Sequence, residues 1–264
     1  MKKTTILDFG RMKEAGEKIV MITAYDAVFS RIFDEAGVDV ILVGDSLGQV
    51  VLGLPNTLGV TMEDMERHTG AAARGRKRAF LAADMPFLSF QAGPRDAILN
   101  AGRLLQAGAE AVKLEGGRNV EATIRAIVAC DIPVMGHVGL TPQSINRMGG
   151  YRIQGKTDVQ RQRLIDDALA VQEAGAFMVV LEGMPSDLAG EITERLTIPT
   201  IGIGAGPRCD GQVLVMQDLL GLFEEFRPRF VKRFGEIKKP VEDAVRAYAD
   251  EVRSGKFPGK EHSF

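Results

Sequence analysis

Short runs of apolar, often β-branched residues alternate along the chain with longer segments whose apolar residues recur every three or four positions. The first pattern is typical of buried strands, and the second of helices that cover them. The pattern predicts strands at 19–24, 39–44, 79–84, 111–115, 132–137, 177–182 and 198–204, with a weaker eighth at 212–216. Because eight alternating strand and helix units need about 250 residues, we predict an α/β protein with a (β/α)8 TIM barrel. A doubly wound open sheet is the alternative.

Several helices show recognisable boundary signals. Thr61 with Asp64 three residues later predicts a helix N-cap, and Pro94 predicts the first turn of another helix. The helix that follows the first strand is predicted to have one apolar face, made of Val28, Ile32, Phe33 and Ala36. We expect these faces to pack on the outside of the barrel.

The bulk composition is that of an ordinary globular protein, with 264 residues, 45% of them hydrophobic, and a formal net charge of −2. This charge gives no reason to expect nucleic acid or an acidic membrane surface as a partner. The chain lacks an apolar run of membrane-span length and a signal-peptide pattern, so we expect a cytoplasmic protein without membrane contact. No change of composition marks a second domain. Residues 1–264 are therefore predicted to form a single barrel domain with a helical C-terminal extension from about residue 223.

Ionisable side chains stand at the ends of five consecutive predicted strands. These residues are Asp45, Asp84, Glu115, His137 and Glu182. In a barrel the carboxyl ends of all strands share one rim, and that rim carries the active site. A single acid in such a place is most often a helix cap or a solvated turn residue, but five in succession favour a common site.

The stretch "AVKLEGG" sets two charges into an apolar strand, at Lys113 and Glu115. Side chains alternate along a strand, so both charges point to one side and the apolar residues between them point to the other. The apolar side suits the helix layer, so we predict that the charged pair faces the barrel interior and its mouth. The same alternation predicts that Asp45 points in the same direction as Val43.

Several carboxylates at one rim repel one another, and Lys113 offsets only one of them. A divalent cation with oxygen ligands would offset the rest, and Mg2+ is the simplest choice because it needs few carboxylates. Zinc is disfavoured, because no cysteine pair stands at ligand spacing and the three histidines, His68, His137 and His262, are scattered.

Two connections are long for a compact domain, at residues 45–60 and 138–157. Long loops without regular structure are usually functional, often as lids over a site. Surface decoration or an oligomer contact is the alternative reading of both.

Sequence motifs at these positions resemble one family. The chain contains "VGDSLG" (43–48), "ADMPF" (83–87) and "VKLEGG" (112–117), together with "MITAYD" (21–26) and the ending "PGKEHSF". In this combination the sequence resembles the ketopantoate hydroxymethyltransferase family, nearly from end to end. The resemblance implies a (β/α)8 barrel, dependence on Mg2+, a homodecamer, and a role in pantothenate and coenzyme A biosynthesis.

The resemblance also implies a role for each rim residue. It implies that the metal is held by Asp45, Asp84 and Glu115. It implies that the 2-oxo acid substrate is bound by Asp45, Ser46, Asp84, Lys113 and His137. It implies that Glu182 is the catalytic base. Three positions depart from residues that are common in the family, namely Gly59, Gly183 and Gln217.

The implied reaction moves a hydroxymethyl group from 5,10-methylenetetrahydrofolate, as cosubstrate, to the small 2-oxo acid 3-methyl-2-oxobutanoate through a Mg2+-stabilised enolate. An alternative within enzymes is a Mg2+-dependent carbon–carbon lyase or aldolase that acts on another 2-oxo acid. A non-catalytic metabolite sensor on the same barrel is disfavoured, because a sensor has no use for a base beside a bound oxo acid.

Overall fold

Eight parallel strands close into a barrel in the computed structural model, which describes residues 2–223 and 228–264. The strands are β1 (Ile19–Thr23), β2 (Val40–Val43), β3 (Phe80–Asp84), β4 (Ala111–Glu115), β5 (Val134–Gly139), β6 (Met178–Glu182), β7 (Thr200–Ile203) and β8 (Gly211–Leu214). They follow one another around the barrel in chain order, and β8 pairs with β1 to close it. The predicted TIM barrel is confirmed, and the open sheet is excluded.

Strand positions agree with the sequence pattern within a few residues, and β5 is the informative difference. It continues to Gly139, because that residue still pairs with Glu182 of β6. His137 therefore lies inside the strand and not at its end. β2, by contrast, ends at Val43, two residues before Asp45.

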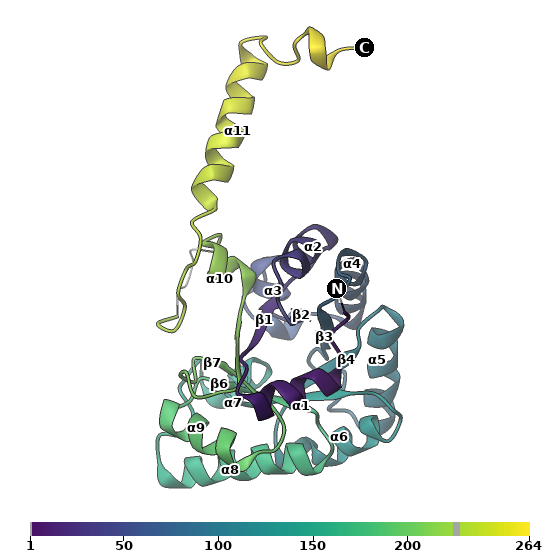
Figure 1. Ribbon diagram of the computed structural model, residues 1–264, viewed down its shortest axis with the longest axis vertical. Helices are drawn as coiled ribbons and strands as arrows, with labels where there is room; N and C mark the ends of the chain where they lie inside the picture. Colours follow the sequence, from purple (N-terminus) through teal and green to yellow (C-terminus); the bar gives the residue numbers. More distant parts are fainter. Residues whose placement is uncertain (1, 224–227) are drawn as a thin grey trace. The chain divides into compact units, whose positions relative to one another are not determined.

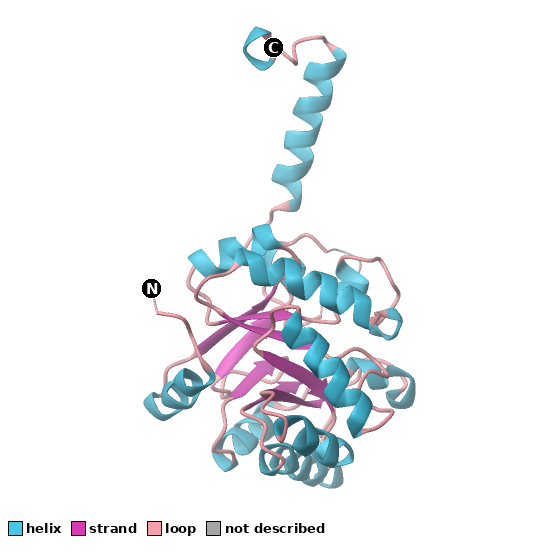
Figure 2. Cartoon of the chain, turned by 90° about the vertical axis from the view of Figure 1, so that its right-hand side faces the viewer, coloured by secondary structure: helices cyan, strands magenta, loops and turns pink. Residues whose placement is uncertain are grey.

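Helices surround the strands of the barrel (Figures 1 and 2). They are α1 (Ile6–Ala15), α2 (Ala27–Glu35), α4 (Met62–Gly75), α5 (Pro94–Gln106), α6 (Glu121–Val128), α8 (Asp158–Glu173) and α9 (Ser186–Arg195). The predicted starts of α4 and α5 are confirmed. The Thr61 hydroxyl accepts a hydrogen bond from the Asp64 N–H at 3.1 Å, and Pro94 opens α5.

Only one residue of the predicted apolar face of α2, Phe33, is buried. Val28 and Ile32 are 65% and 50% exposed, whereas Ser30, Phe33 and Asp34 are buried. The reason is a polar anchor: the Asp34 carboxylate accepts hydrogen bonds from the backbone N–H groups that precede β3. With these contacts Asp34 faces inward. The spacing of apolar residues along the helix cannot predict this orientation, because the partners of Asp34 lie more than 40 residues later in the chain.

The barrel interior is filled by every second residue of the strands, including Met21, Leu42, Ala82 and Val180. Phe9 of α1 closes the amino-terminal end of the barrel. Its ring lies 5.4 Å from Phe80 and 6.2 Å from Phe177, between ring centroids, and it is fully buried. Because aromatic side chains block this end, the space for a ligand is left at the carboxyl ends of the strands.

The chain divides into two compact units, Met1–Val215 and Met216–Phe264. The second unit contains α10 (Met216–Leu220), α11 (Lys238–Arg253) and a 3-10 turn, η4 (Lys260–His262), so the predicted C-terminal helices are present. Within residues 2–223 and 228–264, no helix has both the length and the apolar character needed to cross a membrane.

Candidate active site at the barrel mouth

Lys113 and Glu115 point into the barrel mouth, as the alternation along the strand predicts. Ala111, two residues before Lys113, belongs to the interior cluster of the barrel. Val112 and Leu114 are fully buried but lie outside that cluster, on the side of the helices. The two charges in "AVKLEGG" are therefore buried inside the barrel, at 5% and 6% exposure.

Lys113 is the cation of the site. Its Nζ lies 2.8 Å from Oδ1 of Asp84, and both side chains are nearly inaccessible. Burial opposes its charge, but the carboxylates of Asp84, Glu115 and Asp45 raise the pKa of Lys113 above its ordinary value. Lys113 thus stays protonated and supplies a fixed positive charge at the mouth.

His137 lies between Lys113 and Glu182. Its Nδ1 is 3.2 Å from Lys113 Nζ, and its Nε2 is 3.1 Å from Glu182 Oε2. An ammonium group cannot accept a hydrogen bond, so Nδ1 accepts and Nε2 carries the proton that faces Glu182. That second contact is close but not aligned as a hydrogen bond. Burial, and then the charge of Lys113, lower the pKa of His137, so the ring stays neutral.

Asp45 reaches the mouth by a route that the alternation did not predict. Leu42, and not Val43, faces the barrel interior, so the predicted pairing of Asp45 with Val43 is wrong. β2 ends at Val43, and the turn that follows brings the Asp45 N–H within 3.0 Å of Asp84 Oδ2. Strand alternation no longer applies after the last strand residue, so the turn decides where Asp45 points.

The carboxylates of Asp45 and Glu115 share the mouth with Asp84. Burial, and then the charge of Asp84, raise the pKa of Asp45 to about 7. Burial, and then the charge of Asp45, raise the pKa of Glu115 well above its ordinary value. A cluster of buried carboxylates that raise one another's pKa values is one that a cation would stabilise.

Ser46 is held by a tyrosine that the sequence reasoning did not single out. The Tyr25 hydroxyl lies 2.9 Å from Ser46 Oγ, and the Tyr25 ring is almost completely buried. Burial raises the pKa of Tyr25, so its hydroxyl stays neutral and available for hydrogen bonds. His68 supports the same residue, with Nδ1 2.7 Å from the Tyr25 carbonyl oxygen. Tyr25 lies within the family motif "MITAYD", and this motif could have indicated from the sequence that the residue is functional.

The two long connections contain short helices. The first holds α3 (Leu47–Val50) and η1 (Thr57–Gly59), and the second holds η3 (Pro142–Ser144) and α7 (Ile145–Met148). Tyr151, in the second connection, is close enough to the mouth for the acids to act on it. Burial, and then the charges of Asp45 and Glu182, raise its pKa. The role of either connection as a lid stays a prediction.

Gln143, also in the second connection, is a further residue that sequence reasoning missed. Its side-chain Nε2 lies 2.9 Å from Asp45 Oδ2, and its backbone N–H donates to Glu115 Oε2 at 3.0 Å. A glutamine in a loop carries no chemical signature by itself. The length of the connection, and the motif "PVMGHVGLTPQS" (133–144) that resembles the family, indicated that this segment mattered.

The donor set fits a hard divalent cation better than a soft one. Three buried carboxylates meet at the mouth, and Asp84 Oδ1 has no well-aligned hydrogen bond although Lys113 is near. Among residues 2–223 and 228–264, no three His, Cys, Asp or Glu side chains are already arranged as a complete metal site. Mg2+ suits such a cluster, because it keeps several waters and needs only one or two carboxylates.

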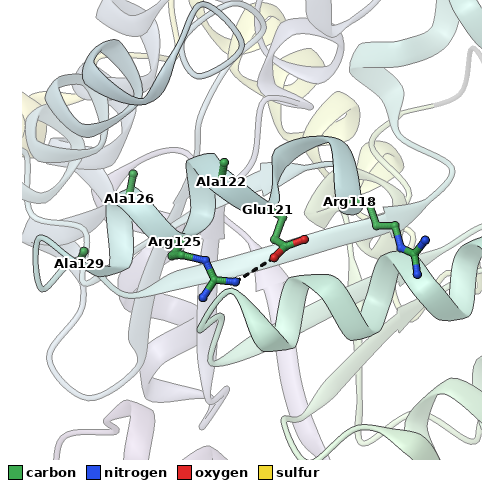
Figure 3. Close-up of a pocket in the computed structure, with 6 residues that line it drawn as sticks. All are labelled: Arg118, Glu121, Ala122, Arg125, Ala126 and Ala129. Carbon is green, nitrogen blue, oxygen red and sulfur yellow. Dashed lines mark hydrogen bonds and ion pairs between the residues drawn. The ribbon is translucent and has the colours of Figure 1, made fainter.

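A surface hollow of about 530 Å³ lies elsewhere, along α6 (Figure 3). It is lined by Arg118, Glu121, Ala122, Arg125, Ala126 and Ala129. Alanines at every third or fourth position have short side chains, so they leave a shallow depression along the helix. Arg125 forms an ion pair with Glu121 at 2.8 Å. None of the predicted site residues lines this hollow.

Solved structures with a similar fold place the protein in a class. A phosphonopyruvate hydrolase in complex with oxalate and Mg2+ matches with a TM-score of 0.63 at 14% identity, over 98% of this chain and 93% of that one. An oxaloacetate acetylhydrolase matches with a TM-score of 0.61 at 16% identity, over 96% and 88%. At such identities the likeness shows the fold alone. The class is that of (β/α)8 barrels with a charged site at the carboxyl ends of the strands.

Sequence comparison identifies the family. Residues 3–260 match the model of the ketopantoate hydroxymethyltransferase family. A 3-methyl-2-oxobutanoate hydroxymethyltransferase of Geobacter sulfurreducens is 62% identical over 98% of both chains. Another, from Geobacter metallireducens, is 61% identical over 100% of this chain and 99% of its own. The chain belongs to the ketopantoate hydroxymethyltransferase family, and the predicted resemblance is confirmed.

Proposed function

We propose that the protein transfers a hydroxymethyl group from 5,10-methylenetetrahydrofolate to 3-methyl-2-oxobutanoate, giving 2-dehydropantoate, in cytoplasmic pantothenate biosynthesis. Family membership along nearly the whole chain supports the reaction. One observation carries the assignment of residues: Asp84, Lys113, His137 and Glu182 form a continuous chain of contacts of 3.2 Å or less at the barrel mouth.

Mg2+ would be held by Asp45, Asp84 and Glu115. These carboxylates are buried together, and the raised pKa values of Asp45 and Glu115 support a cation beside them. When bound, Mg2+ would polarise the keto oxygen of the substrate and stabilise negative charge that develops there.

Lys113, Ser46 and His137 would bind and orient the 2-oxo acid. The ammonium of Lys113 suits the carboxylate of the substrate, and its burial strengthens their attraction. Ser46 Oγ is positioned by Tyr25. The neutral ring of His137 presents no charge that would compete with Lys113.

Glu182 would act as the base. It is the least buried acid of the mouth, with 16% of its side chain exposed, and His137 Nε2 lies 3.1 Å from its Oε2. It would take the proton from C3 of the substrate. Water hydrolyses the donor: both carbon–nitrogen bonds of its methylene carbon break, and tetrahydrofolate leaves while the carbon keeps the water oxygen as formaldehyde. C3 then bonds to this carbon, and the oxygen takes up a proton to become the hydroxyl group of the product. A positioned base of this kind contributes about 10²–10⁴-fold to the rate.

A homodecamer is part of the proposal. Its support beyond family membership is α11, none of whose residues is buried within the chain. Val241, Val245, Tyr248 and Val252 are exposed at spacings of three and four, so they form one apolar stripe along the helix. A stripe of this kind suits contact with another copy of the chain.

A turnover assay tests the function. Purified protein is given 3-methyl-2-oxobutanoate with and without 5,10-methylenetetrahydrofolate, and with and without EDTA. We expect 2-dehydropantoate only when the folate is present, and its loss with EDTA. Cleavage of a 2-oxo acid without folate would favour the lyase or aldolase, and binding without any turnover would favour the sensor.

A further inference from the structure

Gln143 ties together the ends of three strands from a loop that belongs to a fourth. Its side-chain Nε2 lies 2.9 Å from Asp45 Oδ2, after β2, and 2.9 Å from the Met85 carbonyl oxygen, after β3. Its backbone N–H donates to Glu115 Oε2, at the end of β4, at 3.0 Å. Gln143 itself follows β5 and is 7% exposed.

The orientation of the Gln143 amide is determined by its neighbours. The Met85 carbonyl oxygen can only accept, so the group that faces it must be the NH2 group. On the other side, Gln91 Nε2 donates to Gln143 Oε1 at 3.2 Å. The amide nitrogen and the amide oxygen of Gln143 therefore both have partners. If the amide were rotated by 180°, its oxygen would face the Asp45 carboxylate and the Met85 carbonyl oxygen, and all three hydrogen bonds would be lost.

We propose that Gln143 is a positioning residue that orients Asp45 and Glu115 toward a bound Mg2+ ion. This inference rests on the proposed function, because it assigns the same two carboxylates to the metal. Gln143 takes one oxygen of each carboxylate, Oδ2 of Asp45 and Oε2 of Glu115, and leaves the other oxygen of each for a ligand. A carboxylate held in this way cannot rotate freely, so its remaining oxygen is presented in one direction.

The arrangement answers a physical need of this site. Asp45 also lies beside the Asp84 carboxylate, to which its own N–H donates. When both carboxylates are charged they repel each other, which would turn a free Asp45 side chain away from Asp84. A neutral donor with two N–H groups holds Asp45 near Asp84 without adding charge, which neither lysine nor a carboxylic acid could do there.

The test is direct titration of Mg2+ into the substrate-free protein by calorimetry, with Gln143→Met as the main variant. Methionine has a similar length and no amide. Loss of an outer residue that orients metal ligands typically weakens metal binding about 10–100-fold, and we expect a rise of this size in the Mg2+ dissociation constant. In the folate-dependent assay, excess Mg2+ should restore most of the activity of Gln143→Met, because the ligands themselves are intact.

Gln172→Met is the matched control. Gln172 also has a structural amide, since its Oε1 accepts from the Thr197 and Ile198 N–H groups, but it lies away from the mouth. This variant should lower the melting temperature and leave Mg2+ affinity unchanged. If Gln143→Met does not fold, Gln91→Met replaces it, because Gln91 is exposed and its amide contacts Gln143 Oε1. The substitution also removes a long contact, 3.4 Å, between Gln91 Oε1 and the Phe90 N–H. It should weaken Mg2+ binding by a smaller factor.

The outcomes separate this inference from the function on which it rests. A folded Gln143→Met, or in its place Gln91→Met, with wild-type Mg2+ affinity overturns the positioning role alone. Wild-type protein that binds no Mg2+ overturns the proposed metal site and the inference with it. Weakened affinity in Gln172→Met equal to that in Gln143→Met would also overturn it, because the effect would then be general loss of stability.

Discussion

Lys113 and His137 face each other in the barrel mouth, with Nζ of the lysine 3.2 Å from Nδ1 of the histidine. Because the ammonium can only donate, this contact determines the histidine tautomer and leaves the proton on Nε2, which lies 3.1 Å from Glu182 Oε2. His137, on β5, thus lies between the buried cation of the site, Lys113, and the proposed base, Glu182.

Glu182→Gln should abolish removal of the C3 proton but preserve binding. The amide keeps the size of the side chain and still faces His137, but it cannot accept the proton, so we expect exchange in D2O to fall about 10²–10⁴-fold. Proton NMR of 3-methyl-2-oxobutanoate in D2O measures this exchange. Glu191→Gln is the control, because Glu191 is an acid on α9 that pairs with Arg195 outside the mouth. Wild-type exchange in Glu182→Gln would remove this residue from the role of base.

Asp84→Asn should weaken Mg2+ binding while the barrel stays folded. Asp84 accepts from the Asp45 N–H and pairs with Lys113, so an amide at this position keeps an oxygen for the first contact but loses the charge. Calorimetric titration of Mg2+ measures the change, and circular dichroism checks the fold. Undiminished affinity would mean that the metal is held by other residues.

The contribution of Asp45 and Glu115 to the stability of the metal-free protein should fall as the pH rises from about 4 to about 7, whereas the lowered pKa of His137 contributes in the opposite direction. The pKa of Asp45 is raised in the folded state from 3.8 to about 7, so the folded protein holds this proton more tightly than the unfolded chain. The resulting stabilisation is complete below the unfolded value and is lost as the pH passes the folded value. The pKa shift of Glu115 has the same direction.

Bound Mg2+ should reverse this loss, because it takes the place of the protons. The rise in melting temperature on addition of Mg2+ should therefore be larger at about pH 8 than at about pH 5.5. Differential scanning fluorimetry over a pH series measures both effects. Asp45→Asn is the control and should show a weaker dependence on pH, and an equal effect of Mg2+ at both pH values would contradict the prediction.

Asp34→Ala should destabilise the barrel without changing the site. Asp34 accepts from the N–H groups of Lys77, Arg78 and Ala79 at 2.5–2.9 Å. Burial opposes the charge of Asp34, but these donors lower its pKa. Its contribution to folding stability is therefore present when the pH is above the ordinary pKa of a carboxyl group, and it is lost as the pH falls through the lowered pKa. Hydrogen bonds to a charged group contribute about 2 kcal/mol or more, which urea denaturation can detect.

The neighbouring Glu35→Ala is the control for this change. Glu35 is exposed on the same helix, so its replacement should alter the free energy of unfolding by no more than about 0.5 kcal/mol. An Asp34→Ala protein as stable as Glu35→Ala would show that the backbone N–H groups find other partners. Turnover per folded molecule should be unchanged in both variants.

Val245→Asp should reduce the size of the assembly. Val245 lies in the exposed apolar stripe of α11, and a charge there would have to be desolvated in any contact between copies. Size-exclusion chromatography with light scattering should give about ten times 28.6 kDa for the wild type and a smaller mass for the variant. Ala247→Asp, on the other side of the helix, should leave the mass unchanged. A wild-type protein that runs as a monomer would refute the homodecamer directly.

The inward placement of four rim residues could be predicted from the sequence. Asp84, Lys113, Glu115 and Glu182 lie on strands, where side chains alternate strictly, and each follows an interior residue by an even number of positions. Local backbone geometry alone decides their direction. The family motifs then implied a role for each of these residues, and the structure confirms that they lie at the same end of the barrel.

Asp45 and the turned face of α2 could not be predicted in the same way. Asp45 lies beyond the end of β2, where its direction depends on a hydrogen bond to Asp84, 39 residues later. α2 is turned by contacts between Asp34 and residues 77–79. In both cases the deciding partner is distant in the sequence, and periodicity within one segment carries no information about it.

The sequence by itself determined the order of strands and helices and the acids at the strand ends, because repeating local patterns and strand alternation act over a few residues at a time. Closure of the sheet into a barrel was decided by the pairing of β8 with β1. Only the tertiary structure decided that Gln143 joins Asp45 to Glu115, that Tyr25 holds Ser46, and that His137 links Lys113 to Glu182. These contacts join residues from different strands and loops. Their distances are set by how the whole barrel closes, which no single segment encodes.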